Sequence, residues 1–344
     1  MTTTEAEPQT AAEFFKSRKL SPLQRLQQLL HRNPTISPLV VLVGAVLVFA
    51  LINDRFLQPS NLSLVLQQVA IIAALAVGQT LIILTAGIDL SVGAIMIFVA
   101  MVMGTLAGEM DVPGGIAFVV GIAAGAAAGL LNGVLVAVLK LPPFIVTLGT
   151  MGIFTALGLM MSGGRSIRGD QLGSFLTWTS SSISVGPFRL TAGVLLVLVM
   201  YAVGAYVLSQ TSWGRHVYAI GDDPSAAMLA GIRTTRTFLS VYISAGVIFA
   251  LSAWVLIGRV GAATTNSAVD ANLDSITAVV IGGTSLFGGR GRLLGSLIGA
   301  LIVGIFRNGL SLARVDVLWQ TLAIGVLIIA AVSLDQWIRR AGRR

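Results

Sequence analysis

The sequence contains no cysteine and few charged residues. Of its 344 residues only 10% are charged, whereas a soluble domain carries about 25%. The absence of cysteine excludes a disulfide framework and thiolate metal sites, and it leaves the redox compartment open. Hydrophobic residues make up 55% of the chain. A chain this apolar cannot cover itself with polar surface in water, so we expect lipid to surround most of it.

The residues that catalytic and metal sites require are also scarce. Neither His31 nor His216 has a Cys, Asp or Glu at metal-ligand spacing other than by chance. There is no G-x-x-x-x-G-K-[ST] loop to hold nucleotide phosphates. The glycine-rich GGTSLFGGRGRLLG at 282–295 lacks the Lys-Ser/Thr end, so we interpret it as a tight turn between two helices. We therefore expect no catalytic residue, no metal site and no cofactor bound by this chain.

Ten apolar runs approach the length of about 20 residues that a membrane-spanning helix needs. They are 37–52, 62–85, 91–108, 113–139, 144–161, 189–208, 237–258, 272–287, 293–310 and 317–335. The run at 272–287 is the weakest, and a re-entrant segment is the alternative there. The pattern predicts an all-α integral membrane protein with about ten transmembrane helices.

The distribution of basic residues predicts the orientation of these helices. If the N-terminus is cytoplasmic and each run crosses once, Arg307 lies within the ninth run and six arginines lie outside: Arg55, Arg165, Arg168, Arg189, Arg259 and Arg314. The other fifteen of the 22 basic residues then lie inside. This bias fits the positive-inside rule and places both termini in the cytoplasm. The net charge of +8 is thus explained by topology, and we expect no nucleic-acid partner.

The two ends of the chain flank the transmembrane domain at 37–335. Residues 1–36 have no apolar core of signal-peptide length. Ser21, Pro22 and Gln24 suit the start of a capped helix, and the leucines that follow share one face. We expect an amphipathic helix on the cytoplasmic membrane surface, with an unstructured tail as the alternative. Residues 336–344 form a basic cytoplasmic tail in this interpretation.

Two loops stand out by length. The longest outer loop, at about 162–188, is rich in Ser, Gly and Thr, which favour turns over packed helices. The longest inner loop, 209–236, contains AIGDDPSAAMLAGI at 219–232. Asp223 before Pro224 suits a helix start, and Asp222 adds negative charge near that end. Gly231 is placed to end the helix.

This inner-loop helix has about two turns, too few to be stable alone in water. We expect Met228, Leu229 and Ile232 to rest on the membrane helices. Ala226, Ala227 and Ala230 would then leave a smooth face on which another protein docks. An ordinary capped loop helix without a partner is the alternative.

Two further motifs break the apolar runs. In GIDLSVG at 87–93, Gly87 and Gly93 permit a helix break, and Ser91 is placed to cap the helix that follows. Asp89 is costly in lipid, so we expect it at the cytoplasmic edge or in the bundle interior. We favour a structural turn over a direct substrate contact. Residues 140–144, KLPPF, form a second forced break, because proline cannot continue a helix.

Polar side chains within the runs are candidates for a transport path. Amide and hydroxyl groups suit the hydroxyls of a sugar, and an aromatic ring suits its C–H faces. For each residue, hydrogen bonding between helices is the alternative. The scarcity of acidic residues within the runs favours a neutral solute. The candidates are Gln67, Gln68, Gln79, Thr80, Asn132, Thr147, Thr150, Asn308, Trp319 and Gln320.

The inner-loop motif DDPSAAMLAGI resembles the cytoplasmic coupling loop of the membrane subunits of binding-protein-dependent ABC importers. Ala226, Ala227 and Gly231 match that family's pattern with one extra residue before the glycine, and Ser225 stands where an acidic residue is usual. Four stretches resemble the ribose/xylose/fructose-type permeases more closely. They are GRHVYAIGDDPSAAMLAGI, TAGIDLSVGAIM, LNGVLVAVLKLPPFIVTLGTM and VVIGGTSLFGGRGRLLGSLIGALIVGIFRNGL.

The resemblance, which covers about residues 40–335, implies a permease subunit of a monosaccharide importer in a bacterial inner membrane. It implies a separate ATPase subunit that uses ATP and Mg, a periplasmic sugar-binding protein and a second permease copy. An ion-coupled secondary transporter of a small neutral solute is the alternative, and a membrane enzyme or scaffold is disfavoured. The implied ATPase-coupling residues are Asp222, Asp223, Pro224, Ser225, Ala226, Ala227, Met228, Leu229, Ala230 and Gly231.

Overall fold

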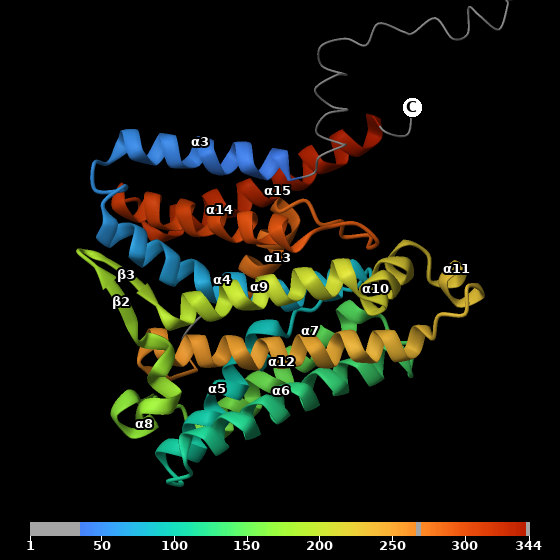
Figure 1. Ribbon diagram of the computed structural model, residues 1–344, viewed down its shortest axis with the longest axis horizontal. Coiled ribbons are helices and arrows are strands. Elements are labelled where there is room, and N and C mark those ends of the chain that lie inside the picture. Colours follow the sequence, from blue (N-terminus) through green and yellow to red (C-terminus); the bar gives the residue numbers. More distant parts are fainter. Residues whose placement is uncertain (1–34, 266–269, 342–344) are drawn as a thin grey trace, which may run out of the picture.

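The computed structural model describes residues 35–265 and 270–341 of the chain. Long helices run side by side between two ends (Figure 1). One end carries α8 (Gly169–Thr177) and the hairpin of β2 (Ser182–Val185) and β3 (Phe188–Thr191). The other carries α10 (Ser212–Asp222) and α11 (Pro224–Leu229). We call them the hairpin end and the α11 end. The amphipathic helix expected to start at Ser21 lies outside the described residues.

Each of the ten apolar runs contains a helix. The helices are α3 (Ile36–Ile52), α4 (Pro59–Leu84), α5 (Val92–Gly108), α6 (Gly114–Ala137), α7 (Pro143–Ser162), α9 (Ala192–Gln210), α12 (Thr234–Val260), α13 (Ala271–Ile281), α14 (Leu293–Leu312) and α15 (Val317–Ala341). Six of them, α4, α6, α7, α9, α12 and α14, are long and apolar enough to cross a membrane. The remaining elements are short and lie in the connections.

The run at 272–287 differs from the others because its helix is short. At 1.5 Å per residue, the 11 residues of α13 extend about 16 Å, roughly half of the hydrocarbon core of a bilayer. An irregular loop, residues 282–292, follows before α14 begins. The glycine-rich stretch GGTSLFGGRGRLLG does connect two helices, as predicted, but as the long 282–292 loop instead of a tight turn.

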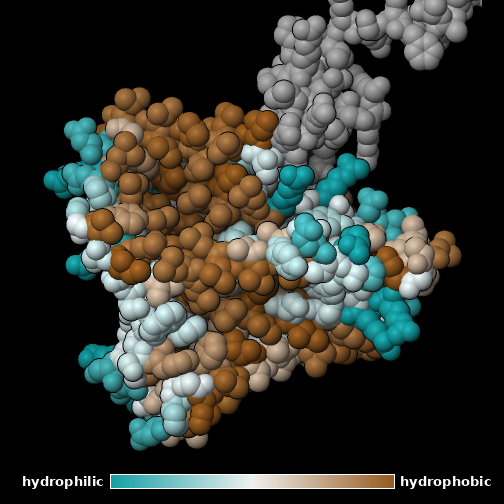
Figure 2. Space-filling model, in the orientation of Figure 1, coloured by the Kyte–Doolittle hydropathy of each residue, from teal (hydrophilic) through white to brown (hydrophobic). Residues whose placement is uncertain are grey.

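The centre of the bundle is formed by α4 and α12, whose side chains are largely buried. Glycines let α6 approach α12 closely, because a Cβ at Gly129 would collide with the Tyr242 carbonyl oxygen and one at Gly246 with the Gly125 carbonyl oxygen. Figure 2 shows hydrophobic residues along the length of the helices and hydrophilic residues gathered at both ends. This distribution is that of a helical bundle whose sides face lipid.

The connection at 162–188 is more ordered than the sequence indicated. It contains β1 (Ile167–Arg168), α8, a 3₁₀ turn η1 (Trp178–Ser180) and the β2–β3 hairpin. The expectation of turns instead of a packed helix was wrong in part. The chain does turn at Gly173, whose φ of 71° interrupts α8, but Leu172 and Leu176 on either side of it are fully buried. Phe175 and Trp178 also stack on Trp254 of α12. β1 pairs with β4 (Ala262–Ala263), which anchors this connection at the hairpin end.

Candidate functional site

The caps of α11 follow the sequence closely. The Asp223 carboxylate accepts hydrogen bonds from the backbone N–H groups of Ser225, at 2.8 Å, and Ala226, at 3.1 Å. Gly231 adopts a left-handed φ of +83° beyond the last turn. The N–H of Ile232 then donates to the Ala227 carbonyl, and that of Gly231 to the Met228 carbonyl, which is a Schellman ending. Both predicted caps are confirmed, while Asp222 belongs to the C-terminal end of α10.

The orientation of α11 differs in part from the one predicted. Ala226 and Ala230 are exposed, as expected of a docking face, and Ile232 is half-buried. Met228 and Leu229 are 61% and 88% exposed, whereas Ala227 is only 4% exposed. The expectation that Met228 and Leu229 rest on the membrane helices was therefore wrong. Ala227 is the residue of α11 that faces inward. The outer surface of α11 thus presents large apolar side chains, and we call Met228 and Leu229 the α11 tip.

A close junction connects α10, and through it α11, to the rest of the bundle. A Cβ at Gly221 would collide with the Leu84 carbonyl oxygen at the end of α4. That carbonyl accepts a hydrogen bond of 3.0 Å from the N–H of Gly289 in the 282–292 loop. A Cβ at Gly289, in turn, would meet the Asp222 backbone. The ends of α4 and α10 and the 282–292 loop therefore touch through backbone atoms, which leaves little room for independent movement.

Tyr218 adds a side-chain bond to this junction. Its hydroxyl donates to the Gly291 carbonyl at 2.9 Å. Burial raises the pKa of the Tyr218 phenol above its ordinary value, and the positive charge of Arg292 opposes that rise. The phenol is therefore protonated at neutral pH and remains a hydrogen-bond donor.

The turn at 85–91 is organised by Asp89. This carboxylate is 1% exposed, in the bundle interior, and one of its oxygens accepts from both the N–H and the hydroxyl of Ser91 at 2.6 Å. Ser91 occupies the N-cap position of α5, as predicted, but its side chain makes no cap hydrogen bond, because its hydroxyl donates to Asp89. The left-handed residue is Ala86, with φ of 61°, and not Gly87. Gly93 lies inside α5, where the side-chain oxygen of Asn272 bonds its N–H.

The structure separates the transport-path candidates into several places. Asn132 bonds Ser91, and Thr147 bonds the Ile88 carbonyl, so both hold the 85–91 turn. Thr150 bonds back to the carbonyl of Thr147.

Other candidates pair elsewhere. Thr80 bonds Ser296 at 2.7 Å, and Asn308 exchanges amide bonds with Asn61. Gln67 lines a cavity of about 90 Å³ with Thr179 and Arg259. Gln68 is half-buried in α4. Gln79 is fully buried, and within the described residues neither of its amide atoms has a partner. Trp319 is 65% exposed, and Gln320 bonds the Val315 carbonyl.

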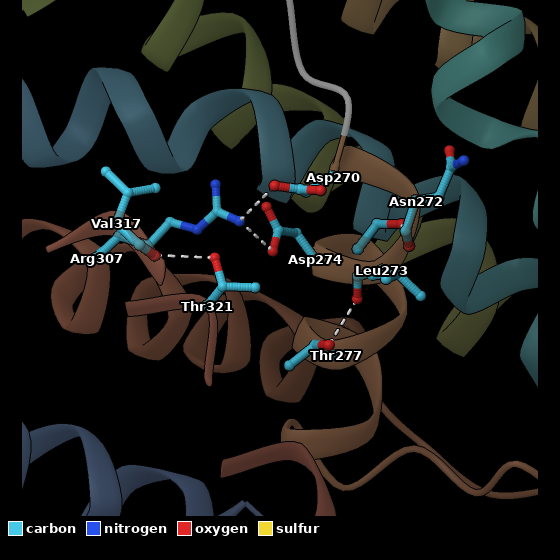
Figure 3. A network of polar contacts seen from close by, with 9 residues as sticks. Asp270, Asn272, Leu273, Asp274, Thr277, Arg307, Val317 and Thr321 are labelled. Atoms are coloured by element: carbon cyan, nitrogen blue, oxygen red, sulfur yellow. Dashed lines mark hydrogen bonds and ion pairs between the residues drawn. The ribbon is translucent and has the colours of Figure 1, made fainter. Parts of the chain in front are cut away.

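One ionic cluster was missed by the sequence reasoning. The Arg307 guanidinium of α14 lies 2.8 Å from Asp274 of α13 and 3.8 Å from Asp270 (Figure 3). The Asp274 side chain is 5% exposed, so the pair is largely inside the bundle. A lone arginine in one apolar run and an aspartate in the preceding one was the signal available. Because Arg307 compensates the buried carboxylate, the pair joins α13 to α14 without an unpaired charge.

Comparison with known proteins decides the family. The family model described as "Branched-chain amino acid transport system / permease component" matches residues 61–332. The chain belongs to this permease family. With its apolar helices, the permease is a multi-pass inner-membrane protein.

Several curated relatives of the permease are sugar importers by name. It is 45% identical over 339 residues to the fructose import permease protein FrcC of Rhizobium meliloti, covering 97% of this chain and 94% of that protein. It is 37% identical over 323 residues to the ribose import permease protein RbsC of Bacillus subtilis, covering 92% and 98%. The RbsC protein of Escherichia coli K12 is 33% identical over 304 residues, covering 86% and 92%. No solved structure matches the chain.

Proposed function

We propose that this permease is the membrane subunit of an ATP-binding-cassette importer that moves a monosaccharide inward by alternating access. The fructose and ribose import permeases among its relatives support the substrate class. The observation that carries the mechanism is the α11 tip. It is an exposed apolar surface on a doubly capped helix, and α10 connects it to α4 and the 282–292 loop through close backbone contacts. An ATPase that pulls or rocks α11 would therefore displace these elements as well.

The energy source in this proposal is a separate ATPase subunit, which binds and hydrolyses ATP with Mg. The permease itself binds no cofactor. A second copy of the permease completes the pathway, and a periplasmic sugar-binding protein delivers the solute to the hairpin end.

The topology in this proposal has ten crossings and two cytoplasmic termini, with the α11 end inside. The path of the chain around α13 supports the count of ten membrane crossings. Ala263 pairs with Ile167 at the hairpin end, and Gly289 meets Asp222 at the α11 end. The chain between them thus passes from one end to the other, although its helix has only half the usual length.

Transport in proteoliposomes tests this function. We expect uptake of radiolabelled fructose or ribose only when the ATPase, the binding protein and ATP are all present. Leucine is the control solute, because the family model is described by branched-chain amino acids. Sugar uptake by the permease alone, driven by an ion gradient, would establish a secondary transporter instead. Uptake of leucine and no sugar would contradict the substrate class.

A further inference from the structure

A cavity of about 450 Å³ opens beside α11. Its walls come from the first turns of α10 and α12 and from the turn that follows α11. Trp213 fixes its shape, because the indole N–H donates to the Ser240 hydroxyl at 2.7 Å and so ties α10 to α12. The volume lies within the range of about 300–1,000 Å³ that small-molecule sites occupy.

The charge of this cavity has one sign. Arg236 lines it from α12, Arg233 from the position just before α12, and His216 from α10, whereas none of its eight lining residues is acidic. Among the side chains that the structure describes, Arg307 is the only arginine in an ion pair. Arg233 and Arg236 are both exposed, Arg233 as the N-cap residue of α12 and Arg236 in its first turn. Such a site favours an anion with oxygen atoms that accept from guanidinium groups.

The apolar part of the wall distinguishes a lipid from a free anion. Trp213 and Ile232 line the cavity together with the two arginines. The apolar stretch of α12 begins directly afterwards, at Phe238 and Leu239, so the cavity lies where this membrane helix meets the aqueous phase. Tryptophan is enriched at that level of a bilayer, and arginine there attracts anionic lipids.

We propose that this cavity binds the phosphate headgroup of an anionic phospholipid of the inner leaflet. The arginines hold the phosphate, and Trp213 and Ile232 cover the glycerol and the first acyl carbons. The assignment to the inner leaflet rests on the orientation given under the proposed function. Because the turn after α11 forms one wall, a bound headgroup also steadies the base of α11.

Lipid retention by the isolated, full-length permease tests the proposal independently of transport. The protein is purified in detergent, offered phosphatidylglycerol or phosphatidylcholine, and examined by native mass spectrometry. We expect the wild-type chain to retain phosphatidylglycerol preferentially. One basic residue near an anionic lipid contributes about fivefold in affinity. R233Q and R236Q should therefore each weaken retention about fivefold, and the double variant about thirtyfold.

The matched control is R215Q, which removes the same charge from an exposed position of α10 outside the cavity. It should retain phosphatidylglycerol as the wild type does, and circular dichroism confirms that each variant is folded. If the double variant fails to fold, the proposal is tested by the lipid preference of the wild-type chain and by lipid retention in the two single variants.

Three results would overturn the proposal. The first is equal retention of both lipids. The second is equally tight binding of inorganic phosphate, which would indicate a free-anion site. The third is a double variant that retains lipid as the wild type does but binds the ATPase more weakly in phosphatidylcholine nanodiscs. That result would mean that the arginines contact acidic residues of the ATPase instead of lipid.

Discussion

Arg307 and Asp274 form a 2.8 Å ion pair that joins the half-length helix α13 to α14 inside the bundle. Breaking a buried pair on one side leaves an uncompensated charge, which costs about 3–5 kcal/mol. The Arg307 side chain is 36% exposed, so we expect R307M to lie near the lower end of that range. Thermal unfolding in detergent measures the loss.

The control for this pair is the double variant R307M/D274L, which removes both charges. It should recover most of the stability that R307M loses, because an apolar pair of similar size replaces the ion pair without leaving a buried charge. If the double variant is as unstable as the sum of the two single variants, the pair contributes no interaction energy.

The junction at Gly221 predicts a strong effect from one methyl group. A Cβ there would collide with the Leu84 carbonyl oxygen, so G221A should destabilise the permease by about 1–3 kcal/mol, as overpacking does. G44A is the matched control, since a Cβ at Gly44 in α3 meets nothing within 4 Å. It should leave the melting temperature unchanged or slightly raised. A normal melting temperature for G221A would mean that the junction is loose.

The cap of α11 predicts a difference between two adjacent aspartates. D223A removes the acceptor for the Ser225 and Ala226 N–H groups and should destabilise α11 by about 1 kcal/mol. D222A makes the same chemical change at the end of α10, where the carboxylate caps no helix start. Hydrogen exchange across 223–231 should therefore accelerate in D223A only. Equal exchange in both variants would show that the cap does not hold this helix.

The absence of cysteine makes the orientation directly measurable. S225C lies on α11 and S184C on the hairpin, and both positions are exposed. In intact cells whose outer membrane is permeabilised, a membrane-impermeant maleimide should label S184C, and it should label S225C only after the inner membrane is broken. The reverse labelling would invert the topology, and labelling of both in intact cells would place both loops on one side.

Local features of the fold were predictable from sequence. The apolar runs predicted where the helices lie. The Asp-Pro start and the glycine end of α11 were also predictable, because each forms hydrogen bonds with residues only a few positions away. The direction in which α11 faces was not predictable, because apolar side chains occupy all its sides and only the packing of Ala227 decides. The sequence identified the polar candidates but not the residues with which they form hydrogen bonds. Asn61 and Asn308, for example, are 247 positions apart and meet only when α4 packs on α14.

Binding of the ATPase subunit to L229E tests the central claim most directly. Leu229 is 88% exposed at the α11 tip, so a charge there should leave the fold intact and remove the apolar contact on which docking depends. V185E places the same charge at a 72% exposed position of the hairpin and is the control. We predict that L229E fails to co-purify with the ATPase and loses ATP-driven sugar uptake, whereas V185E co-purifies with the ATPase as the wild type does. Normal co-purification and uptake by L229E would contradict the account.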